Sequence, residues 1–172
     1  VDTKKCTGCG ACVRECPKAL FDLQDDDVSI YLACSSHDKG KVAKSVCSVG
    51  CIACNICVKV SESEAVSMDN FLPSIDYSAS PNLVLAHYKC PTHSYIDLAP
   101  KRPYMSIDTK CKGHGKCKEV CPVKNCIEGE PGQTHRINSK TCIGCGKCLE
   151  VCPEKAINVI GAMGYVGNNV SP

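Results

Sequence analysis

The chain has 172 residues, 18 of them cysteine and none tryptophan, and its formal net charge at pH 7 is +2. This composition excludes most ordinary enzymes, because so cysteine-rich a chain is expected to need metal centres or disulfides in support of a small core. No run of 18 apolar residues and no charged-then-apolar leader occurs, so we expect neither a membrane span nor a signal peptide. The chain starts at Val1 rather than Met, which indicates a fragment or a processed form.

The first and the last groups of cysteines share one spacing, CxxCxxCxxxCP. The first group consists of Cys6, Cys9, Cys12 and Cys16, and the last consists of Cys142, Cys145, Cys148 and Cys152. Structural zinc uses two cysteine pairs separated by a longer span, and a disulfide framework uses dispersed cysteines, so both fit less well. The spacing is that of bacterial ferredoxins, in which thiolates hold iron and sulfide. We therefore predict iron–sulfur clusters, with zinc and disulfides as the alternatives.

Two features of this motif guide the remaining assignments. Three cysteines at three-residue spacing surround one cluster only if the backbone turns sharply, which explains the glycines between them, Gly8 and Gly10 in the first motif. The fourth cysteine, before the proline, ligates the neighbouring cluster and not its own. Motifs of this kind are therefore expected in pairs, and an unpaired motif needs an explanation.

The middle of the chain holds two incomplete motifs. Cys51, Cys54 and Cys57 lack a fourth cysteine, because Ser61 occupies its place. Cys90 precedes a proline, but the three positions at motif spacing before it are Ser80, Leu83 and Ala86. Under the pairing rule the four vacant positions would have held one cluster, and the four remaining cysteines would hold the other. We predict that Cys51, Cys54, Cys57 and Cys90 form one site; the alternative is that Cys90 is an ordinary buried thiol.

The last part of the chain has a nearly complete pair of motifs. Cys121 is expected to join three cysteines of the last motif in a [4Fe-4S] site, made by Cys121, Cys142, Cys145 and Cys148. The second site has Cys111, Cys117 and Cys152, with His114 where a cysteine belongs. It holds either a [3Fe-4S] cluster or a [4Fe-4S] cluster completed by His114 or Cys126. Seven-iron ferredoxins resemble this half of the chain.

The first motif lacks a partner. Cys6, Cys9 and Cys12 need a fourth ligand, and Cys47 and Cys34 are the spare thiols. If Cys47 is the fourth ligand, the first motif pairs with the motif that begins at Cys51. Cys16 then takes the place of Cys90 beside Cys51, Cys54 and Cys57. Cys34 follows a strand-like stretch and is either a further ligand or a buried cysteine.

We expect an α+β fold of tandem bacterial ferredoxin-like domains. The chain divides into a polyferredoxin region at 1–100 with one degenerate cluster site, a linker at 101–106, and a two-cluster ferredoxin domain with a tail at 107–172. Each short helix is expected to run from the third to the fourth cysteine of its motif. Strands are expected at Val28–Ala33, Ala65–Met68, Arg136–Asn138 and Ile157–Ile160.

Several stretches resemble the soluble part of the B subunit of the Rnf complex, a membrane-bound system that couples ferredoxin and NAD. They are VDTKKCTGCGACVRECPKALF, YLACSSHDKGKVAKSVCSVGCIACNICVKV, and SIDYS with KCPTHSYIDLAPKRP. The resemblance covers about residues 1–105 and includes the stretch CSSHDKGK, which makes it more specific than the cluster motifs alone. The chain departs from that family at Ser61, Ser80, Leu83 and Ala86, where the family would carry cysteine.

The resemblance implies an electron-transfer subunit with about three or four [4Fe-4S] clusters and, as the alternative at one site, a [3Fe-4S] cluster. Such a chain is not an enzyme on its own. Its expected partners are other subunits of a redox complex and soluble ferredoxin or flavoprotein, at the cytoplasmic face of a cell membrane. The alternatives are the ferredoxin subunit of another oxidoreductase, such as a hydrogenase or formate dehydrogenase, and an iron–sulfur sensor. We expect no nucleic-acid partner, because Lys39, Lys41 and Lys44 are too few for a basic stripe.

Overall fold

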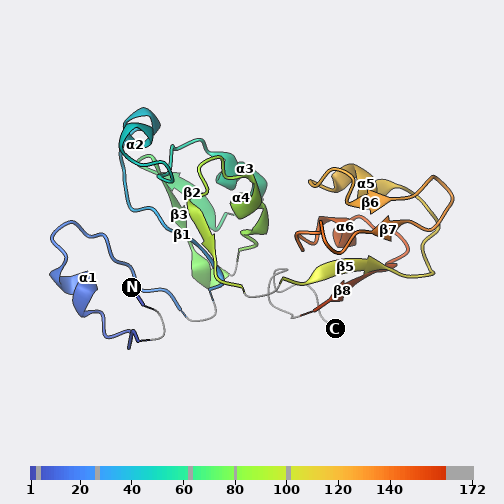
Figure 1. The fold of residues 1–172 in the computed structure, drawn as a ribbon, viewed down its shortest axis with the longest axis horizontal. Helices are drawn as coiled ribbons and strands as arrows, with labels where there is room; N and C mark the ends of the chain where they lie inside the picture. The colour runs from blue at the N-terminus through green and yellow to red at the C-terminus, as the bar shows by residue number, and fades with distance from the viewer. Residues whose placement is uncertain (3–4, 26–27, 62–63, 80, 100–101, 162–172) are drawn as a thin grey trace.

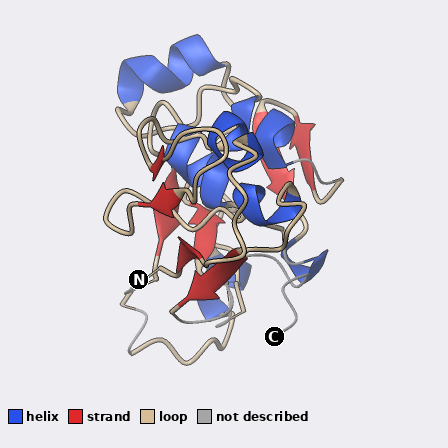
Figure 2. Ribbon diagram, turned by 90° about the vertical axis from the view of Figure 1, so that its right-hand side faces the viewer, coloured by secondary structure: helices blue, strands red, loops and turns tan. Residues whose placement is uncertain are grey.

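The computed structural model describes residues 1–2, 5–25, 28–61, 64–79, 81–99 and 102–161. In this part of the chain the helices and strands are short, and loops join them over much of the length (Figures 1 and 2). Four antiparallel sheets of two strands each carry the fold, two in the middle of the chain and two in the last third. The expected mixture of helices and strands is therefore confirmed.

The middle unit is built from two nested strand pairs. Its outer pair joins β1 (Ile30–Leu32) to β4 (Tyr95–Asp97), and its inner pair joins β2 (Val66–Asp69) to β3 (Leu72–Ile75). Between the strands lie α2 (Gly40–Val46), α3 (Ile56–Ser61), the 3-10 turn η1 (Tyr77–Ala79) and α4 (Val84–Lys89). Since β1 and β4 are far apart in sequence, their pairing brings Cys90 back towards the segment that follows β1.

The C-terminal unit repeats this order of elements. Its outer pair joins β5 (Tyr104–Ile107) to β8 (Ile157–Ile160), and its inner pair joins β6 (Ile127–Glu128) to β7 (Arg136–Ile137). The helices α5 (Lys116–Val120) and α6 (Lys147–Glu150) take the places of α3 and α4. Residues 104–106, expected in the linker, belong to β5, because pairing with β8 extends the unit to Tyr104. Residue 100 of the expected polyferredoxin region, residue 101 of the expected linker and residues 162–172 of the expected tail lie outside the described residues.

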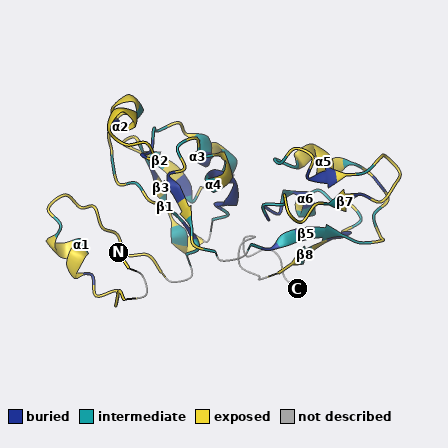
Figure 3. Ribbon diagram, in the orientation of Figure 1, coloured by how far each residue is buried: buried dark blue, intermediate teal, exposed yellow. Residues whose placement is uncertain are grey.

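The first 25 residues carry α1 (Ala11–Glu15), a helix in which no residue is buried. Figure 1 shows this segment, in blue, lying apart from the middle unit, and Figure 3 shows it as almost entirely exposed. Leu20 and Leu23, which follow the helix, are also exposed, at 55% and 53%. The first cysteine motif therefore folds locally but has no apolar core of its own.

Each of the two larger units has its own core. In the middle unit the core lies between α4 and the outer strands, and in the C-terminal unit it lies around Met105 and Ile157. The two units also touch. The side chain of Asn82 donates a hydrogen bond to the backbone oxygen of Cys145 (3.0 Å), and Cys145 packs within the core of the middle unit.

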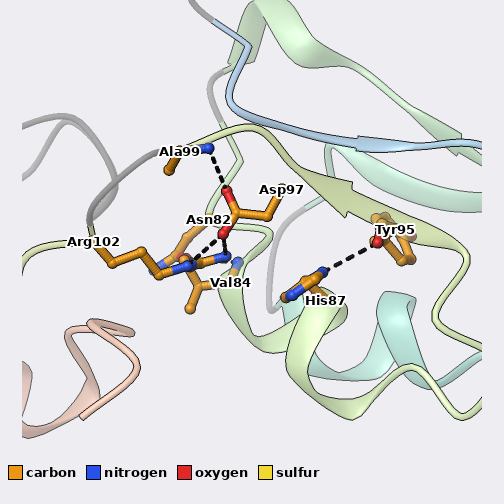
Figure 4. A network of polar contacts seen from close by, with 7 residues as sticks. All are labelled: Asn82, Val84, His87, Tyr95, Asp97, Ala99 and Arg102. Carbon is orange, nitrogen blue, oxygen red and sulfur yellow. Dashed lines mark hydrogen bonds and ion pairs between the residues drawn. The ribbon is translucent and has the colours of Figure 1, made fainter. Parts of the chain in front are cut away.

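The linker is fixed to the middle unit by a half-buried ion pair. The Arg102 guanidinium binds the Asp97 carboxylate at the end of β4, with Nε 2.6 Å from the carboxylate oxygen, and the backbone N–H of Ala99 donates to the same carboxyl group (Figure 4).

The expected elements compare closely with those found. All four expected strands are present, within two residues at their N-terminal ends and one at their C-terminal ends. The expected helices begin about one residue before the third cysteine of their motifs. The sequence patterns did not predict α2, β3, β4, β5 or β6. None of the helices in the described part of the chain has the length and the apolar run that a bilayer crossing needs.

Candidate iron–sulfur sites

The loops between the cysteines share one backbone geometry. In three of the four motif loops, glycines with positive φ stand on both sides of the second cysteine position, at Gly8 and Gly10, Gly113 and Gly115, and Gly144 and Gly146. In the remaining loop Ala53 and Asn55 adopt the same conformation, with φ of 54° and 61°. This left-handed backbone makes the sharp turns that let three side chains point to one side.

The turns after the Cys-Pro pairs are also alike. The backbone N–H three residues after Cys16, Cys90 and Cys152 donates to the cysteine's own carbonyl oxygen, at 3.1, 3.3 and 3.2 Å. The donor residues, Ala19, His93 and Lys155, all have φ near 50°, at 48°, 53° and 48°. Cys90 therefore stands in the same local geometry as the fourth cysteines of the two complete motifs.

The middle unit contains a partly open cavity whose lining includes four cysteines. They are Cys51, Cys54, Cys57 and Cys90, the four that the pairing rule groups together. The rest of the lining is largely apolar and includes Leu32, Met68, Ala86 and Tyr95. Figure 1 shows that α3 and α4, which carry or flank these cysteines, lie side by side, and they share many contacts.

The sulfur of Cys90 accepts a hydrogen bond from the backbone N–H of Ser94 (3.3 Å), and the Thr92 hydroxyl lies 3.8 Å from it. Although burial alone would raise the pKa of the Cys90 thiol, hydrogen bonds from Ser94 and Thr92 outweigh it and lower that pKa. A thiolate at this position is thus stabilised, as a metal ligand requires. In the C-terminal unit Ala156 donates to the sulfur of Cys152 in the same way, at 3.3 Å.

The vacant cluster position of the middle unit is filled by its own core. Leu83 and Ala86 are buried, with 3% and 1% of their surface exposed, and both belong to the apolar core around α4. The Ser61 hydroxyl donates to the backbone oxygen of Val58 (3.0 Å). Ser80, the fourth vacant position, lies outside the described residues. Packed side chains thus occupy the region from which the sequence predicts that a cluster has been lost.

The C-terminal unit also contains a partly open cavity. Its lining includes five cysteines: Cys121, Cys126, Cys142, Cys145 and Cys148. Burial raises the pKa of Cys148 to about 12 and that of Cys126 to about 11. The backbone N–H of Met105 donates to the sulfur of Cys142 at 3.5 Å. Four of the five cysteines are the predicted set, and Cys126 lies beside them.

The position of Cys126 differs from one of the expected alternatives. It lines the cavity of Cys121 and Cys142, and the charges of those two thiols are among the causes that raise its pKa. The short segment from Cys121 to β6 directs Cys126 towards Asn138, whose backbone oxygen lies 3.9 Å from its sulfur. The structure therefore does not bring Cys126 to the site of Cys111, Cys117 and Cys152.

The third site gathers three cysteines near one another. Burial raises the pKa of Cys117, and the nearby thiols of Cys111 and Cys152 raise it further. His114 is exposed, and its Nε2 lies 3.9 Å from a carboxylate oxygen of Glu154. Sequence reasoning missed His135, which is 3% exposed and places Nδ1 4.0 Å from the sulfur of Cys111. Only the β6–β7 hairpin brings His135 there, and no spacing in the sequence indicates it.

The first motif is not brought to either spare thiol. Cys6, Cys9 and Cys12 are exposed, and hydrogen bonds from backbone N–H groups lower the pKa of Cys9. Cys47 is exposed at the end of α2, and Figure 1 shows α1 and α2 well apart. The structure thus does not bring the first motif to Cys47. Cys34 instead lies in the middle unit, where its sulfur accepts a hydrogen bond from the N–H of Cys51 (3.3 Å).

These arrangements fit polynuclear clusters better than single ions. Among the described residues, no group of three or more His, Cys, Asp or Glu side chains is close enough to hold one metal ion. Tetrahedral zinc needs four ligands around a single atom. Four thiols that line one cavity, with the backbone N–H of Ser94 directed at the sulfur of Cys90, suit a larger group made of iron and sulfide.

Comparison with known proteins agrees with this chemistry. A family model described as a 4Fe-4S dicluster domain matches residues 103–153, and one described as a 4Fe-4S binding domain matches residues 1–19. A probable ferredoxin of Methanosarcina thermophila is 52% identical over 29 residues, which cover 17% of this chain and half of that protein. The 4Fe-4S domains expected from the cysteine spacing are thereby confirmed.

Two longer matches belong to ion-translocating complexes. The B subunit of the Na(+)-translocating ferredoxin:NAD(+) oxidoreductase complex of Acetobacterium woodii is 35% identical over 91 residues. The B subunit of the ion-translocating oxidoreductase complex of Methanosarcina acetivorans is 41% identical over 76 residues. The matches cover 53% and 44% of this chain but only 27% and 29% of those relatives. Over about half of its length, the chain is thus an iron–sulfur relative of the B subunits of these complexes, as its resemblance to the Rnf family predicts.

Proposed function

We propose that the chain transfers electrons through bound iron–sulfur clusters, as a subunit of an Rnf-like oxidoreductase complex, and that it makes or breaks no substrate bond itself. The observation that supports this most is the cavity of the middle unit, where four cysteines from two distant segments converge. A bound cluster would supply one-electron chemistry there. The four cysteines would hold the cluster, and the backbone N–H of Ser94 is directed at the sulfur of Cys90.

The proposed ligands follow the geometry of three sites. The middle and C-terminal units are taken as two tandem ferredoxin-type domains, the first with one cluster and the second with two. The thiols of the first motif would serve a further cluster, which gives three or four in all. The three sites with described geometry use Cys51, Cys54, Cys57 and Cys90; Cys121, Cys142, Cys145 and Cys148; and Cys111, Cys117 and Cys152.

For the third site we propose a [3Fe-4S] cluster. The side chain at the vacant second position, His114, is exposed and faces Glu154. Cys126 is buried at the other cavity. Three thiolates are the ligand number that a three-iron cluster needs, so an electron paramagnetic resonance signal from the oxidised protein is expected.

The proposed partners are the other subunits of the complex and a soluble ferredoxin or flavoprotein that exchanges electrons with it. This part of the proposal is supported by the likeness to the two B subunits, one of which is named for a ferredoxin and NAD(+) reaction. We place the chain at the cytoplasmic face of the membrane, in association with membrane-bound subunits.

Anaerobic reconstitution with iron and sulfide tests the cluster assignment. The wild-type chain is expected to bind iron and acid-labile sulfide together and to give resonance signals on reduction with dithionite. Cys90→Ala should lose one cluster, which is about four irons. The matched variant Cys34→Ala, from the same unit, should lose none, since Cys34 is absent from the cavity lining. Binding of zinc without sulfide would instead indicate a structural metal protein.

A further inference from the structure

The cavity of the middle unit contains a hydroxyl group with no hydrogen-bond partner. Tyr95 is 3% exposed, and among the described residues its hydroxyl oxygen is a buried side-chain atom without a partner. Tyr95 is also part of the cavity lining, together with the four cysteines. Since an unpaired buried hydroxyl is unfavourable, it is expected to find an acceptor when the cavity is filled.

The backbone of Tyr95 is held on both sides. In the register of the outer sheet, Tyr95 lies opposite Leu32 of β1. The neighbouring residues are also paired, because the N–H of Ala33 donates to the backbone oxygen of Ser94 (2.8 Å). His87 of α4 places Nδ1 3.2 Å from the backbone oxygen of Tyr95, as Figure 4 shows. The backbone of Tyr95 is therefore held in place beside the cavity that this residue lines.

The candidate acceptor is the sulfur of Cys57, which packs in the same core as Tyr95. Cys57 is 7% exposed and lines the same cavity. Other donors already serve a different sulfur, because Ser94 and Thr92 are directed at Cys90.

We propose that the Tyr95 hydroxyl donates a hydrogen bond to the Cys57 sulfur when the middle site holds its cluster, and that this bond raises the reduction potential of that cluster. The inference rests on the proposed function. A donor dipole directed at a ligand sulfur stabilises the additional negative charge of the reduced state. One electron enters from a one-electron reductant and leaves to an oxidant, and no bond to Tyr95 forms or breaks. Tyr95 is thus a positioning and tuning residue, not a ligand.

The C-terminal unit has an apolar residue at the position that matches Tyr95. Ile157 occupies the equivalent place, five residues after its Cys-Pro cysteine, and pairs with Ile107 as Tyr95 pairs with Leu32. Ile157 is buried in the core that contains Cys117, and its side chain has no hydrogen to donate. The two units therefore differ in donor chemistry at matched positions.

The test compares Tyr95→Phe with Tyr77→Phe in the reconstituted full chain. Tyr77 is a fitting control because its hydroxyl lies in the same core but accepts a hydrogen bond from the N–H of Leu32 (3.1 Å). The resonance signal that disappears in Cys90→Ala identifies the middle cluster. In a redox titration, Tyr95→Phe should shift the midpoint potential of that signal to lower values. Tyr77→Phe should leave it unchanged, and neither variant should move the other signals.

A second measurement does not depend on the stability of the variants. Electron–nuclear double resonance of the reduced wild-type chain, in water and in deuterium oxide, should detect an exchangeable proton coupled to the middle cluster. That coupling should be absent in Tyr95→Phe and present in Tyr77→Phe. An unchanged potential and an unchanged proton coupling in Tyr95→Phe, with full iron content, would overturn the proposal. A wild-type chain that binds no iron and sulfide would overturn the proposed function as well, so the two failures are distinguishable.

Discussion

Single residues in the motif loops carry backbone strain that the glycines avoid. Ala53 has φ of 54°, where the other motif loops have Gly8, Gly113 and Gly144. A residue with a Cβ atom pays about 1–2 kcal/mol in this left-handed conformation, whereas asparagine tolerates it better. The middle site thus holds its ligands on a loop that is less relaxed than those of the other motifs.

Replacing Ala53 by glycine should stabilise the loaded chain. The expected gain is up to about 1 kcal/mol, because relief of the left-handed strain exceeds the additional chain entropy that glycine loses on folding. Anaerobic unfolding in denaturant, followed by circular dichroism, measures it. Asn55→Gly is the matched control, since Asn55 has φ of 61° but is a better-tolerated residue type, so its gain should be smaller. An equal or larger gain from Asn55→Gly would contradict the assignment of strain to Ala53.

At the scale of elements, α2 supports the loop that carries Cys51 and Cys54. Its first residue, Gly40, lies so close to this loop that an added Cβ atom would stand 2.1 Å from the backbone oxygen of Ile52. This contact gives a structural reason for the glycine in the stretch CSSHDKGK, which contains no motif cysteine spacing. The helix is short and mostly exposed, so it acts mainly through this close approach.

Gly40→Ala should therefore destabilise the middle site. Because the obstructing atom belongs to the backbone, either α2 or the ligand loop must shift, at a cost of about 1–3 kcal/mol. The loaded variant should unfold at lower denaturant concentration and lose the resonance signal of the middle cluster first. Lys44→Ala serves as the control on the same helix, since Lys44 is exposed. If Gly40→Ala and Lys44→Ala were equally stable, the close approach of Gly40 to Ile52 would not contribute to stability.

The sequence predicted the features that depend on local spacing in the chain, and it did not predict those that depend on how the chain folds. Motif spacing and the pairing rule predicted the four cysteines that line the cavity of the middle unit, including Cys90, and four of the five that line the cavity of the C-terminal unit, because ligand chemistry imposes local patterns. The positions of Tyr95 and His135 could not be predicted, since the pairing of β1 with β4 brings Tyr95 to its cavity and the β6–β7 hairpin brings His135 to Cys111. The pairing of the first motif through Cys47 also lies beyond local patterns and stays a prediction, although α1 and α2 lie apart in Figure 1.

At the scale of the whole molecule, each of the two larger units has little besides its candidate cluster sites to keep it folded. The sheets have two strands each, and such pairs are marginally stable in water on their own. The apolar cores are small and contain cysteines, among them Cys57 in the middle unit and Cys117 and Cys148 in the C-terminal unit. Burial raises the pKa of Cys148 to about 12, so without iron this thiol stays protonated and neutral at pH 7. Cluster binding releases such protons and is coupled to folding.

Removal of iron should consequently unfold both larger units. A strong iron chelator under anaerobic, reducing conditions is expected to abolish the far-ultraviolet circular dichroism of the folded chain as the iron leaves. Addition of iron and sulfide should restore it, which separates loss of the clusters from irreversible damage. Because stabilisation by a ligand grows with its free concentration, the loaded chain should also unfold at higher temperature when excess chelator is absent. A folded spectrum that persists after all iron has been removed would mean that the apolar cores and the contact between Asn82 and Cys145 suffice without clusters.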